Sequence, residues 1–471
     1  MGSGTNPSKV SAMSAAHPHV VVVGAGLAGA RTVQELRRVG FPGAITLVGA
    51  EVQPPYDRPP LSKGPLDEVP GLGIDFADLG VTSMFGRTAT AISGISPAGD
   101  APLHIRLAVS NEAAVSNEAT VSTEVTVSTE AIGSPQPADS ELTADAIVIA
   151  TGAEPVFPES WLDVPGVRVL RSWRDAVALW RDLADLGPDG RVVIAGGSWI
   201  GMELASVANR LGAQVRVVEK AAWLLPLLPP EVGRQVALWC REAGIETSVG
   251  DTVLTVASGP ADGSEPRVAV TTSAGDFGAD LVVVALGVTP TTSWLAGSGL
   301  RTSPRGHALR VDSHLSTLDD RVFAIGDTVE RWSPRYGAWL PGGHWQDAMD
   351  QPVVAAANVR AMLAGERQRE VYDAVPYLWS EILGHTLQWS GYLADYRAAR
   401  MLVRGDLAGP SWTVVWLDDD DRMLAILACD RPRDAMAARK AQAAHPSGTP
   451  LADVRALADP STPLKSCLIK V

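Results

Sequence analysis

The sequence is poor in cysteine, in positive charge and in long apolar runs, and each shortage excludes a class of protein. Its 471 residues include only three cysteines, Cys240, Cys429 and Cys467, which are far apart in the chain. This number and spacing indicate neither a disulfide framework nor a metal site, and we expect free thiols. No apolar run reaches the length of about eighteen residues that a membrane-spanning helix needs.

The shortage of basic charge bears on the partners of the chain. It carries 39 Lys and Arg residues against 53 Asp and Glu residues, a formal net charge of −14. Nucleic acids and anionic membranes bind basic surfaces, so neither is an expected partner. Residues 1–17 lack the basic start and the apolar segment of a signal peptide, and we interpret them as a flexible tail on a cytoplasmic protein.

What the sequence does contain is the same pattern twice. Residues 20–23 (VVVV) predict a buried strand, followed by a glycine-rich turn, a helix to Arg38 and a second strand at 45–48. Residues 191–219 repeat this order. Each unit has the length of a βαβ motif, so we expect two nucleotide-binding sheets in a chain long enough for two or three domains.

Other parts of the chain show different patterns. Residues 108–140 contain a six-residue Val-Ser-x-Glu repeat, which predicts a solvated insertion or a frayed β-hairpin without chemistry of its own. After Tyr372, short alternating strands at 412–416 and 423–427 and a helix at 434–444 indicate a separate α+β domain.

The first glycine-rich turn, residues 24–29 (GAGLAG), fits the GxGxxG pattern directly between a strand and a helix. The first glycine permits the tight turn, the second lets a pyrophosphate approach the backbone, and the third packs the helix on the strand. The helix N-terminus then supplies free N–H groups for the anion. Glu51, just past the second strand, is placed to accept a hydrogen bond from a ribose hydroxyl.

The second turn, residues 195–201 (AGGSWIG), has Ser198 where the second glycine of the pattern is expected, and we expect its Cβ to restrict the backbone there. Glu219 ends the following strand. A carboxylate at that position favours a free ribose 2′-hydroxyl and repels a 2′-phosphate. We therefore expect NADH to be preferred over NADPH. NADPH stays an alternative, because the neighbouring Lys220 is long enough to reach a 2′-phosphate.

Two such turns about 170 residues apart resemble the arrangement in the two-dinucleotide-binding flavoprotein reductases. Residues 55–63 (PYDRPPLSK) look like a hallmark segment of the FAD-dependent ferredoxin reductases, among them the putidaredoxin and rubredoxin reductases. The resemblance runs from about residue 20 to about residue 427 and is interrupted by the repeat insertion. Further matching segments are 150–152 (ATG), 287–290 (GVTP), 323–327 (FAIGD), 344–348 (HWQDA) and 375–380 (VPYLWS).

The resemblance implies an α/β fold with two Rossmann-like, glutathione-reductase-like dinucleotide-binding domains and a C-terminal α+β domain. It implies an enzyme that passes a hydride from NADH to FAD, and then single electrons to a ferredoxin-type iron–sulfur protein serving an oxygenase or a P450. The implied boundaries are a tail at 1–17, an FAD domain at 18–155 and 285–365, an NADH domain at 156–284 and the C-terminal domain at 366–471.

The resemblance also assigns the ligands of the two cofactors, and it implies no metal ligand. The candidate FAD ligands are Gly24, Gly26, Leu27, Ala28, Gly29, Glu51, Arg58, Lys63, Ala150, Thr151, Gly152, Gly326, Asp327 and Trp345. The candidate NADH ligands are Gly196, Gly197, Ser198, Trp199, Ile200, Gly201, Glu203, Glu219 and Gly287.

Lys63 and Glu203 are the candidate catalytic residues. In the family the lysine lies near the flavin and often pairs with the glutamate, which we place on the first turn of its helix, facing the nicotinamide. Their implied roles are electrostatic, because hydride transfer needs proximity more than acid–base help. Without the flanking motifs, Lys63 would be interpreted as a surface residue and Glu203 as a carboxylate that stabilises the helix N-terminus.

Electrons must leave the flavin without a disulfide, because no cysteine precedes Cys240 and the CxxxxC pair of the disulfide reductases is absent. Ferredoxins are acidic, so docking requires a local basic patch on this acidic chain. The chain differs from the family at Gly343, Glu381 and Ile382, which affects the expected contacts with the acceptor. Seven basic residues of the C-terminal region are candidates for this patch, and the alternative is that they are scattered, solvated side chains. They are Arg397, Arg400, Arg404, Arg431, Arg433, Arg439 and Lys440.

Two other functions stay open from the sequence. An NADH oxidase or quinone-type reductase would need no protein partner, whereas a redox-sensing flavoprotein similar to apoptosis-inducing factor would use NADH to drive a conformational or oligomeric switch. Both a monomer and a homodimer are compatible with the sequence. His344 and His385 lack metal-ligand spacing, and we expect them to be structural histidines.

Overall fold

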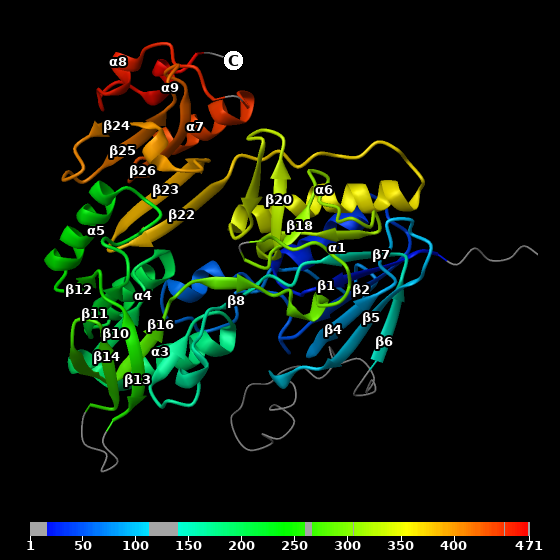
Figure 1. Ribbon diagram of the computed structural model, residues 1–471, viewed down its shortest axis with the longest axis horizontal. Coiled ribbons are helices and arrows are strands. Elements are labelled where there is room, and N and C mark those ends of the chain that lie inside the picture. Colours follow the sequence, from blue (N-terminus) through cyan, green and yellow to red (C-terminus); the bar gives the residue numbers. More distant parts are fainter. Residues whose placement is uncertain (1–16, 113–139, 260–265, 305, 447, 470–471) are drawn as a thin grey trace, which may run out of the picture.

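The computed structural model describes residues 17–112, 140–259, 266–304, 306–446 and 448–469 (Figure 1). The chain forms two units built on parallel sheets and a C-terminal unit built on an antiparallel sheet. The predicted repeat lies between two described strands, but residues 113–139 of it are outside the described part of the chain.

The first unit contains a five-stranded parallel sheet in the order β19-β7-β1-β2-β3. Helix α1 (Leu27–Arg38) packs against α6 (Trp345–Leu363), so two segments about 300 residues apart in sequence lie together. Because both faces of the sheet are covered, all four valines of residues 20–23 are buried. The strands are β1 (His19–Val23), β2 (Ala44–Gly49), β3 (Val81–Phe85), β7 (Ala146–Ile149) and β19 (Val322–Ala324).

Two small sheets complete the first unit, one wholly antiparallel and one with a parallel and an antiparallel strand pair. One contains the two strands that flank the repeat, and in it Leu107 pairs with Ser140. The strands are β4 (Arg87–Ser93), β5 (Leu103–Val109) and β6 (Ser140–Ala144) in one sheet, and β18 (Leu309–Val311), β20 (Val329–Ser333) and β21 (Ala338–Pro341) in the other.

The second unit repeats the plan with a parallel sheet in the order β12-β11-β10-β16-β9. The strands are β9 (Val167–Val169), β10 (Arg191–Ala195), β11 (Gln214–Glu219), β12 (Glu246–Val249) and β16 (Leu281–Val284). The other elements of this unit are the helices α3 (Trp173–Leu186), α4 (Trp199–Arg210) and α5 (Pro230–Glu242), and the antiparallel strands β13 (Val253–Ser258), β14 (Val268–Thr272) and β15 (Asp276–Ala279).

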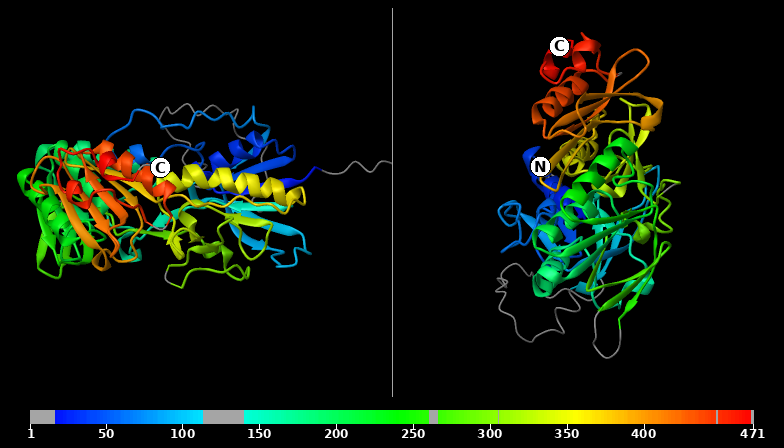
Figure 2. Two further views of the ribbon diagram at one scale, coloured as in Figure 1. Left: turned by 90° about the horizontal axis from the view of Figure 1, so that it is seen from above. Right: turned by 90° about the vertical axis from the view of Figure 1, so that its left-hand side faces the viewer.

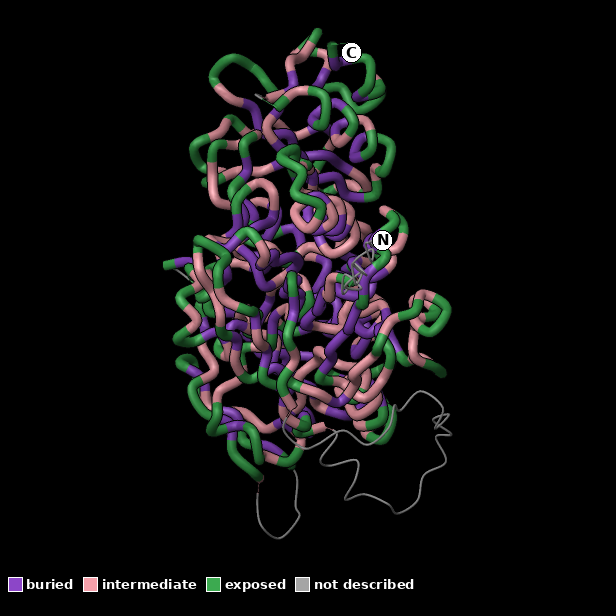
Figure 3. The backbone as a smooth tube through the Cα atoms, turned by 90° about the vertical axis from the view of Figure 1, so that its right-hand side faces the viewer, coloured by how far each residue is buried: buried purple, intermediate pink, exposed green. Residues whose placement is uncertain are grey.

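Two short strands connect the first and second units. Strand β8 (Ala153–Pro155) leaves the first unit, β17 (Val288–Pro290) returns to it, and the two pair antiparallel. Figure 3 shows the buried stretches of chain running through the middle of the molecule, with the exposed turns outside. No helix in the described residues is long and apolar enough to cross a membrane.

The C-terminal unit is an antiparallel sheet in the order β22-β23-β26-β25-β24, and it lies next to the second unit (Figures 1 and 2). The strands are β22 (Tyr377–Ile382), β23 (His385–Gly391), β24 (Arg400–Gly405), β25 (Trp412–Leu417) and β26 (Met423–Cys429). The helices are α7 (Pro432–Ala444), α8 (Val454–Leu457) and α9 (Leu464–Cys467).

Strand β25 departs from the alternation that the sequence analysis assigned to this region, because it is buried along its whole length. Trp412, Val414 and Trp416 join the core of the second unit on one face of the sheet. Val415 and Leu417 pack with residues of α7 and α9 on the other face. The prediction of alternation was wrong here, since a strand covered on both faces has no polar side.

Candidate functional site

The two glycine-rich turns have the same backbone conformation. The first glycines, Gly24 and Gly196, have φ angles of +113° and +112°, which residues other than glycine rarely adopt. At the next motif position, Gly26 has φ −84° and ψ −169°, and Ser198 has φ −90° and ψ −167°. This is extended backbone open to any residue. The expectation that the Cβ of Ser198 restricts the backbone was therefore wrong.

The third glycine of each turn is required by packing. A Cβ on Gly29 would lie 1.8 Å from the carbonyl oxygen of Gly24, and a Cβ on Gly201 would lie 2.0 Å from that of Gly196. Each helix therefore starts in contact with the turn before it, and neither α1 nor α4 has a side-chain cap on its first N–H groups. A Cβ on Gly26 would meet nothing within 4 Å. The first turn thus leaves open space at the uncapped start of α1, which fits a pyrophosphate.

The other candidate ligands around the two turns lie at the N-termini of α1 and α4 and just past the carboxyl end of a strand. Leu27 and Ala28 begin α1, and Trp199 and Ile200 begin α4, with Ile200 exposed. Gly287 lies just past the carboxyl end of β16, the strand that pairs with β10 beside the second turn. The carboxyl ends of parallel strands are where open α/β sheets bind ligands.

Glu219 is tied to the second turn. Its side chain is 8% exposed, and its carboxylate accepts hydrogen bonds from the N–H groups of Gly197 and Ala221, both at 2.7 Å. A Cβ on Gly197 would lie 3.1 Å from the Cβ of Glu219. The same Cβ would lie 2.6 Å from Cδ2 of Leu224, so the glycine makes room for the side chains of both Leu224 and Glu219.

Glu51 is held in the first unit by two side chains of the 55–63 segment. Its carboxylate accepts hydrogen bonds from the Tyr56 hydroxyl and from the Arg58 guanidinium, both at 2.5 Å. Tyr56 in turn accepts a hydrogen bond from the Trp173 N–H at 2.8 Å, and burial raises the pKa of its hydroxyl above the usual range. These bonds fasten the segment to both nucleotide-binding units.

Arg171, which the sequence analysis missed, lies between two candidate FAD ligands. Its carbonyl accepts a hydrogen bond from Arg58 at 2.6 Å, and its guanidinium pairs with Asp327 at 3.3 Å. Burial lowers the pKa of Arg171, and the nearby Arg58 acts in the same direction. No motif surrounds Arg171 in the sequence, so the only available signal was its place between a strand and a capped helix.

Gln351, also missed, supplies a buried polar group next to Asp327. Its carbonyl oxygen accepts a hydrogen bond from the Gly326 N–H at 2.7 Å, while its buried amide nitrogen has no hydrogen-bond partner in the described chain. A buried unpaired donor is costly, which fits a polar ligand at this place. Of the neighbouring candidates, Thr151 donates to the carbonyl of Thr291 at 2.8 Å, and Ala150 and Gly152 lie just past the carboxyl end of β7.

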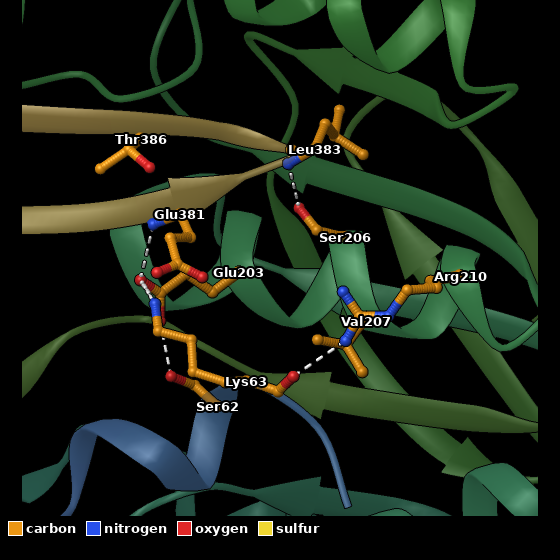
Figure 4. Close-up of a pocket in the computed structure, with 10 residues that line it drawn as sticks. Ser62, Lys63, Glu203, Ser206, Val207, Arg210, Glu381, Leu383 and Thr386 are labelled. Carbon is orange, nitrogen blue, oxygen red and sulfur yellow. Dashed lines mark hydrogen bonds and ion pairs between the residues drawn. The ribbon is translucent and has the colours of Figure 1, made fainter. Parts of the chain in front are cut away.

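Lys63 and Glu203 form an ion pair in the lining of a cavity (Figure 4). The ammonium of Lys63 lies 2.5 Å from the Glu203 carboxylate, which also accepts hydrogen bonds from Ser62 at 2.5 Å and from Ser380 at 2.6 Å. Glu203 is 5% exposed. The three units of the fold therefore converge on one carboxylate, which each of them contacts.

Glu203 lies on the second turn of α4 rather than on the first as predicted, because the helix already begins at Trp199. Its carboxylate binds side chains of other segments, so it does not serve to stabilise the helix N-terminus. Lys63 has a side-chain exposure of 27% and is paired, unlike the surface lysine of the alternative interpretation.

Two cavities flank this ion pair. One of about 140 Å³ is lined by residues that include Lys63, Glu203, Glu381 and Thr386. The other, of about 350 Å³, is lined by Lys63, Asp57 and Trp379 together with prolines of the 55–63 segment. Lys63 borders both, so its ammonium is placed between two accessible spaces.

Trp345 begins α6 beside the second cavity. Its indole N–H donates to Asp57 at 2.8 Å, and its ring meets that of Trp379 edge to face at 5.4 Å. Tyr377 stacks on Trp379 at 6.2 Å, and the guanidinium of Arg439 lies 4.6 Å from the centre of the Tyr377 ring. A row of aromatic rings thus runs from α6 to β22 and ends against Arg439 of α7.

The structure separates the C-terminal cations that the sequence analysis grouped together. Arg404 is wholly buried and pairs with Asp434 at 3.0 Å, so its inclusion in a docking patch was wrong. Arg397, Arg400 and Arg431 pair with the aspartates 395, 421 and 434. Within the described residues, the candidates without an ion pair are Arg433, Arg439 and Lys440, all on α7.

Two nucleotide cradles at the carboxyl ends of separate parallel sheets, with a buried ion pair between the units, define an oxidoreductase that works with two dinucleotides. The profile of the pyridine nucleotide-disulphide oxidoreductases matches residues 18–352, and that of the reductase C-terminal domain matches residues 377–468. The chain belongs to the pyridine nucleotide-disulphide oxidoreductase family, whose cofactors are FAD and NADH.

Curated relatives of the chain include ferredoxin–NAD(+) reductases and a putidaredoxin reductase. The ferredoxin–NAD(+) reductase component of an anthranilate 1,2-dioxygenase system from Burkholderia cepacia is 32% identical over 449 residues, which are 95% of this chain and 98% of the relative. A putidaredoxin reductase of Pseudomonas putida is 28% identical, with 88% and 90% of the two chains covered. The crystal structure of a covalent putidaredoxin reductase–putidaredoxin complex has a TM-score of 0.78 at 26% identity and covers 96% of this chain and 98% of its own.

Proposed function

We propose that the chain is an NADH-dependent ferredoxin reductase, which takes a hydride from NADH and delivers single electrons to a small iron–sulfur protein that serves an oxygenase or a P450. The observation that carries this proposal is the Lys63–Glu203 ion pair at 2.5 Å, to which Ser380 of the C-terminal unit also bonds. It lies where a nicotinamide from the second cradle and a flavin from the first would meet. Relatives that cover nearly the whole chain are reductase components of dioxygenase systems.

The chain's own residues would bind and orient the two cofactors. The open cradle at Gly26 would hold the FAD pyrophosphate, Glu51 the ribose, and Asp327 with Arg171 the ribityl chain. The cradle at Ser198 would hold the NADH pyrophosphate. Bound FAD supplies the chemistry of accepting two electrons together and releasing them singly.

Lys63 and Glu203 would act by electrostatics and position. The Lys63 ammonium would stabilise negative charge that builds up at the flavin, and Glu203 would hold this ammonium in place and orient the nicotinamide. The donors Ser62 and Ser380 fix the carboxylate in turn. Such fixed groups need no rearrangement when the hydride moves, which is the source of their effect on the rate.

The preference for NADH over NADPH would rest on Glu219. Its carboxylate is fixed by two backbone N–H groups at the edge of the second cradle, where a 2′-phosphate would meet its negative charge. Lys220 beside it is exposed. An exposed lysine is strongly hydrated and flexible, so we expect it to offset little of this repulsion.

The electron acceptor would dock on α7. Arg433, Met436 and Lys440 are exposed and follow one another at three- and four-residue spacing, so they share a face of this helix. An acidic iron–sulfur protein fits a basic face with an apolar centre. The aromatic row that ends at Arg439 connects this face with Trp345 at the expected flavin site.

An anaerobic titration of the purified protein with NADH, followed by a cytochrome c assay with and without added ferredoxin, tests the proposal. We expect bleaching of the flavin by one equivalent of NADH and turnover that requires the ferredoxin. Rapid oxygen consumption without ferredoxin would instead support an NADH oxidase. A long-lived charge-transfer complex with dimer formation would support a redox sensor, and a protein that stays colourless in excess FAD would overturn the flavoenzyme proposal as a whole.

We also place the enzyme in the cytoplasm. Its three cysteines are free and buried, which suits a reducing compartment, and NADH is supplied there. Recovery of the native enzyme in a periplasmic or secreted fraction would contradict this placement.

A further inference from the structure

A cluster of three potential metal ligands lies outside the nucleotide site. His385 begins β23, and Cys429 ends β26, the strand next to it in the sheet, with Asp430 directly after. The ring nitrogen Nδ1 of His385 lies 2.7 Å from Oδ2 of Asp430 and 4.0 Å from Sγ of Cys429. The sulfur lies 3.7 Å from the same Oδ2. Three atoms of different ligand types therefore face one point.

We propose that His385, Cys429 and Asp430 form a binding site for Zn²⁺. A sulfur, an imidazole nitrogen and a carboxylate oxygen are the three donor types that zinc prefers. In a tetrahedral zinc site, the bond lengths to these donors put sulfur and nitrogen about 3.6 Å apart and nitrogen and oxygen about 3.4 Å apart. The cluster needs shifts of only a few tenths of an ångström to about 0.7 Å to reach these spacings.

The three ligands are already held in place by their neighbours. The ring of His385 stacks on Trp239 of α5, with 4.0 Å between centroids and an interplanar angle of 19°. Oδ1 of Asp430 accepts the Thr386 N–H at 2.8 Å, which leaves Oδ2 directed at the other two ligands. Cys429 is fully buried, and its strand pairs with β23 and β25. Ligands on rigid strands with fixed rotamers bind a metal with little loss of entropy.

The site has three protein ligands and an open side. The side chains of His385 and Asp430 are 25% and 32% exposed, so zinc can enter from solvent and keep a water molecule as its fourth ligand. His385 lies between Gly384 and Thr386, which both line the cavity behind Glu203. Bound zinc would thus fix the β22–β23 turn beside that cavity and hold the ring of His385 against Trp239 of α5.

The direct test uses untagged, EDTA-treated holoenzyme, which is dialysed against Zn²⁺ and analysed for metal per protein chain. We expect one tightly bound zinc per chain, quenching or enhancement of the fluorescence of Trp239, and a higher thermal midpoint because the metal binds only the folded state. Co²⁺ in place of Zn²⁺ should give thiolate-to-cobalt absorption that the variants lack.

Three ligand variants and two controls make the result specific. Cys429→Ser, Asp430→Asn and His385→Phe should each weaken zinc binding at least tenfold. His385→Phe keeps an aromatic ring on Trp239 and removes the ligand nitrogen, so it separates the metal role from the packing role. The controls Cys467→Ser and His307→Ala alter a thiol and an imidazole outside the cluster and should bind zinc as the parent protein does.

Two results would overturn the proposal. One is zinc binding that is equally tight in the parent and in all three ligand variants, which would place the metal elsewhere. The other is no bound zinc at concentrations at which a Cys-His-Asp site is filled, which would leave the cluster as a hydrogen-bonded group that packs the sheet on α5. Neither result depends on the reductase activity, so the proposal fails or stands separately from the proposed function.

Discussion

At the scale of single residues, the environment of a side chain decides more than its type. Glu203 and Lys63 are among many glutamates and lysines in the chain, but they form an ion pair that is largely shielded from water and bonded to two serines. Glu219 is likewise distinguished by the two N–H groups that hold it. Substitutions at these positions test the site most directly.

Lys63→Ala should slow the reduction of the flavin by NADH about 10- to 100-fold, because it removes the positive charge next to the reacting atoms. Anaerobic stopped-flow absorbance measures this rate. The substitution leaves Glu203 buried without its cation, so we also expect a loss of about 1–3 kcal/mol in stability. Lys465→Ala, at an exposed lysine on α9, is the matched control. Wild-type rates with full flavin content in Lys63→Ala would remove Lys63 from the site.

Glu219→Arg should shift the ratio of kcat/KM for NADPH over NADH upward by at least about tenfold, because it replaces a repulsive charge with an attractive one near the 2′-position. The same change removes the acceptor of the Gly197 and Ala221 N–H groups, so activity with NADH should fall as well. Glu219→Gln keeps a side-chain acceptor without the charge and controls for this loss. An unchanged cofactor ratio in Glu219→Arg would contradict the assignment of Glu219 to the ribose.

At the scale of elements, the junction between a turn and its helix sets the shape of each cradle. The carbonyl oxygen of Gly196 lies so close to Gly201 that the start of α4 has no room for a side chain there. Ser198 is at the preceding position of the glycine motif, three residues before Gly201, and its backbone is extended, a conformation open to any residue. These neighbouring positions should therefore tolerate change very differently.

Gly201→Ala should destabilise the protein by about 1–3 kcal/mol and weaken NADH binding by at least tenfold, because the helix must move away from the turn. Ser198→Gly should leave the KM for NADH within about twofold of the parent. Thermal unfolding and steady-state kinetics of the two variants measure these effects. Equal tolerance at both positions would show that the close contact between helix and turn does not shape the cradle.

At the scale of the whole molecule, the proposed mechanism depends on contact between the three units. Ser380 of the C-terminal unit bonds to Glu203 of the second unit, which pairs with Lys63 of the first. Helix α7 presents its basic face on the C-terminal unit of a chain whose net charge is −14. A partner of negative charge must therefore be attracted locally, against the field of the rest of the molecule.

The double variant Arg433→Glu and Lys440→Glu should raise the KM for an acidic ferredoxin at least fivefold and reduce the dependence of this KM on salt, because both charges act on the encounter. NADH-dependent reduction of ferricyanide, which needs no docking, should stay unchanged. Arg241→Glu on α5 is the control for an exposed helical arginine outside the face. Equal salt dependence in the double variant and the parent would place the docking surface elsewhere.

The sequence by itself determined the two βαβ units, the glycine cradles and the family, because each depends on local spacing: a strand, a turn and a helix that follow one another in the chain. It also predicted Lys63 and Glu203 through the motifs around them. It did not reveal Arg171 or Gln351, since nothing near them in the sequence shows that they face Asp327. The sequence also did not predict that Arg404 is buried.

Only the tertiary structure decided which distant residues meet. Glu203 gains Ser62 and Ser380 from segments 141 and 177 residues away, and His385 meets Cys429 across two paired strands 44 residues apart in the chain. Strand β25 is buried on both faces because the second unit covers one side and α7 the other. Local patterns encode the elements, whereas contacts between remote segments arise only when burial of the apolar faces packs these elements together.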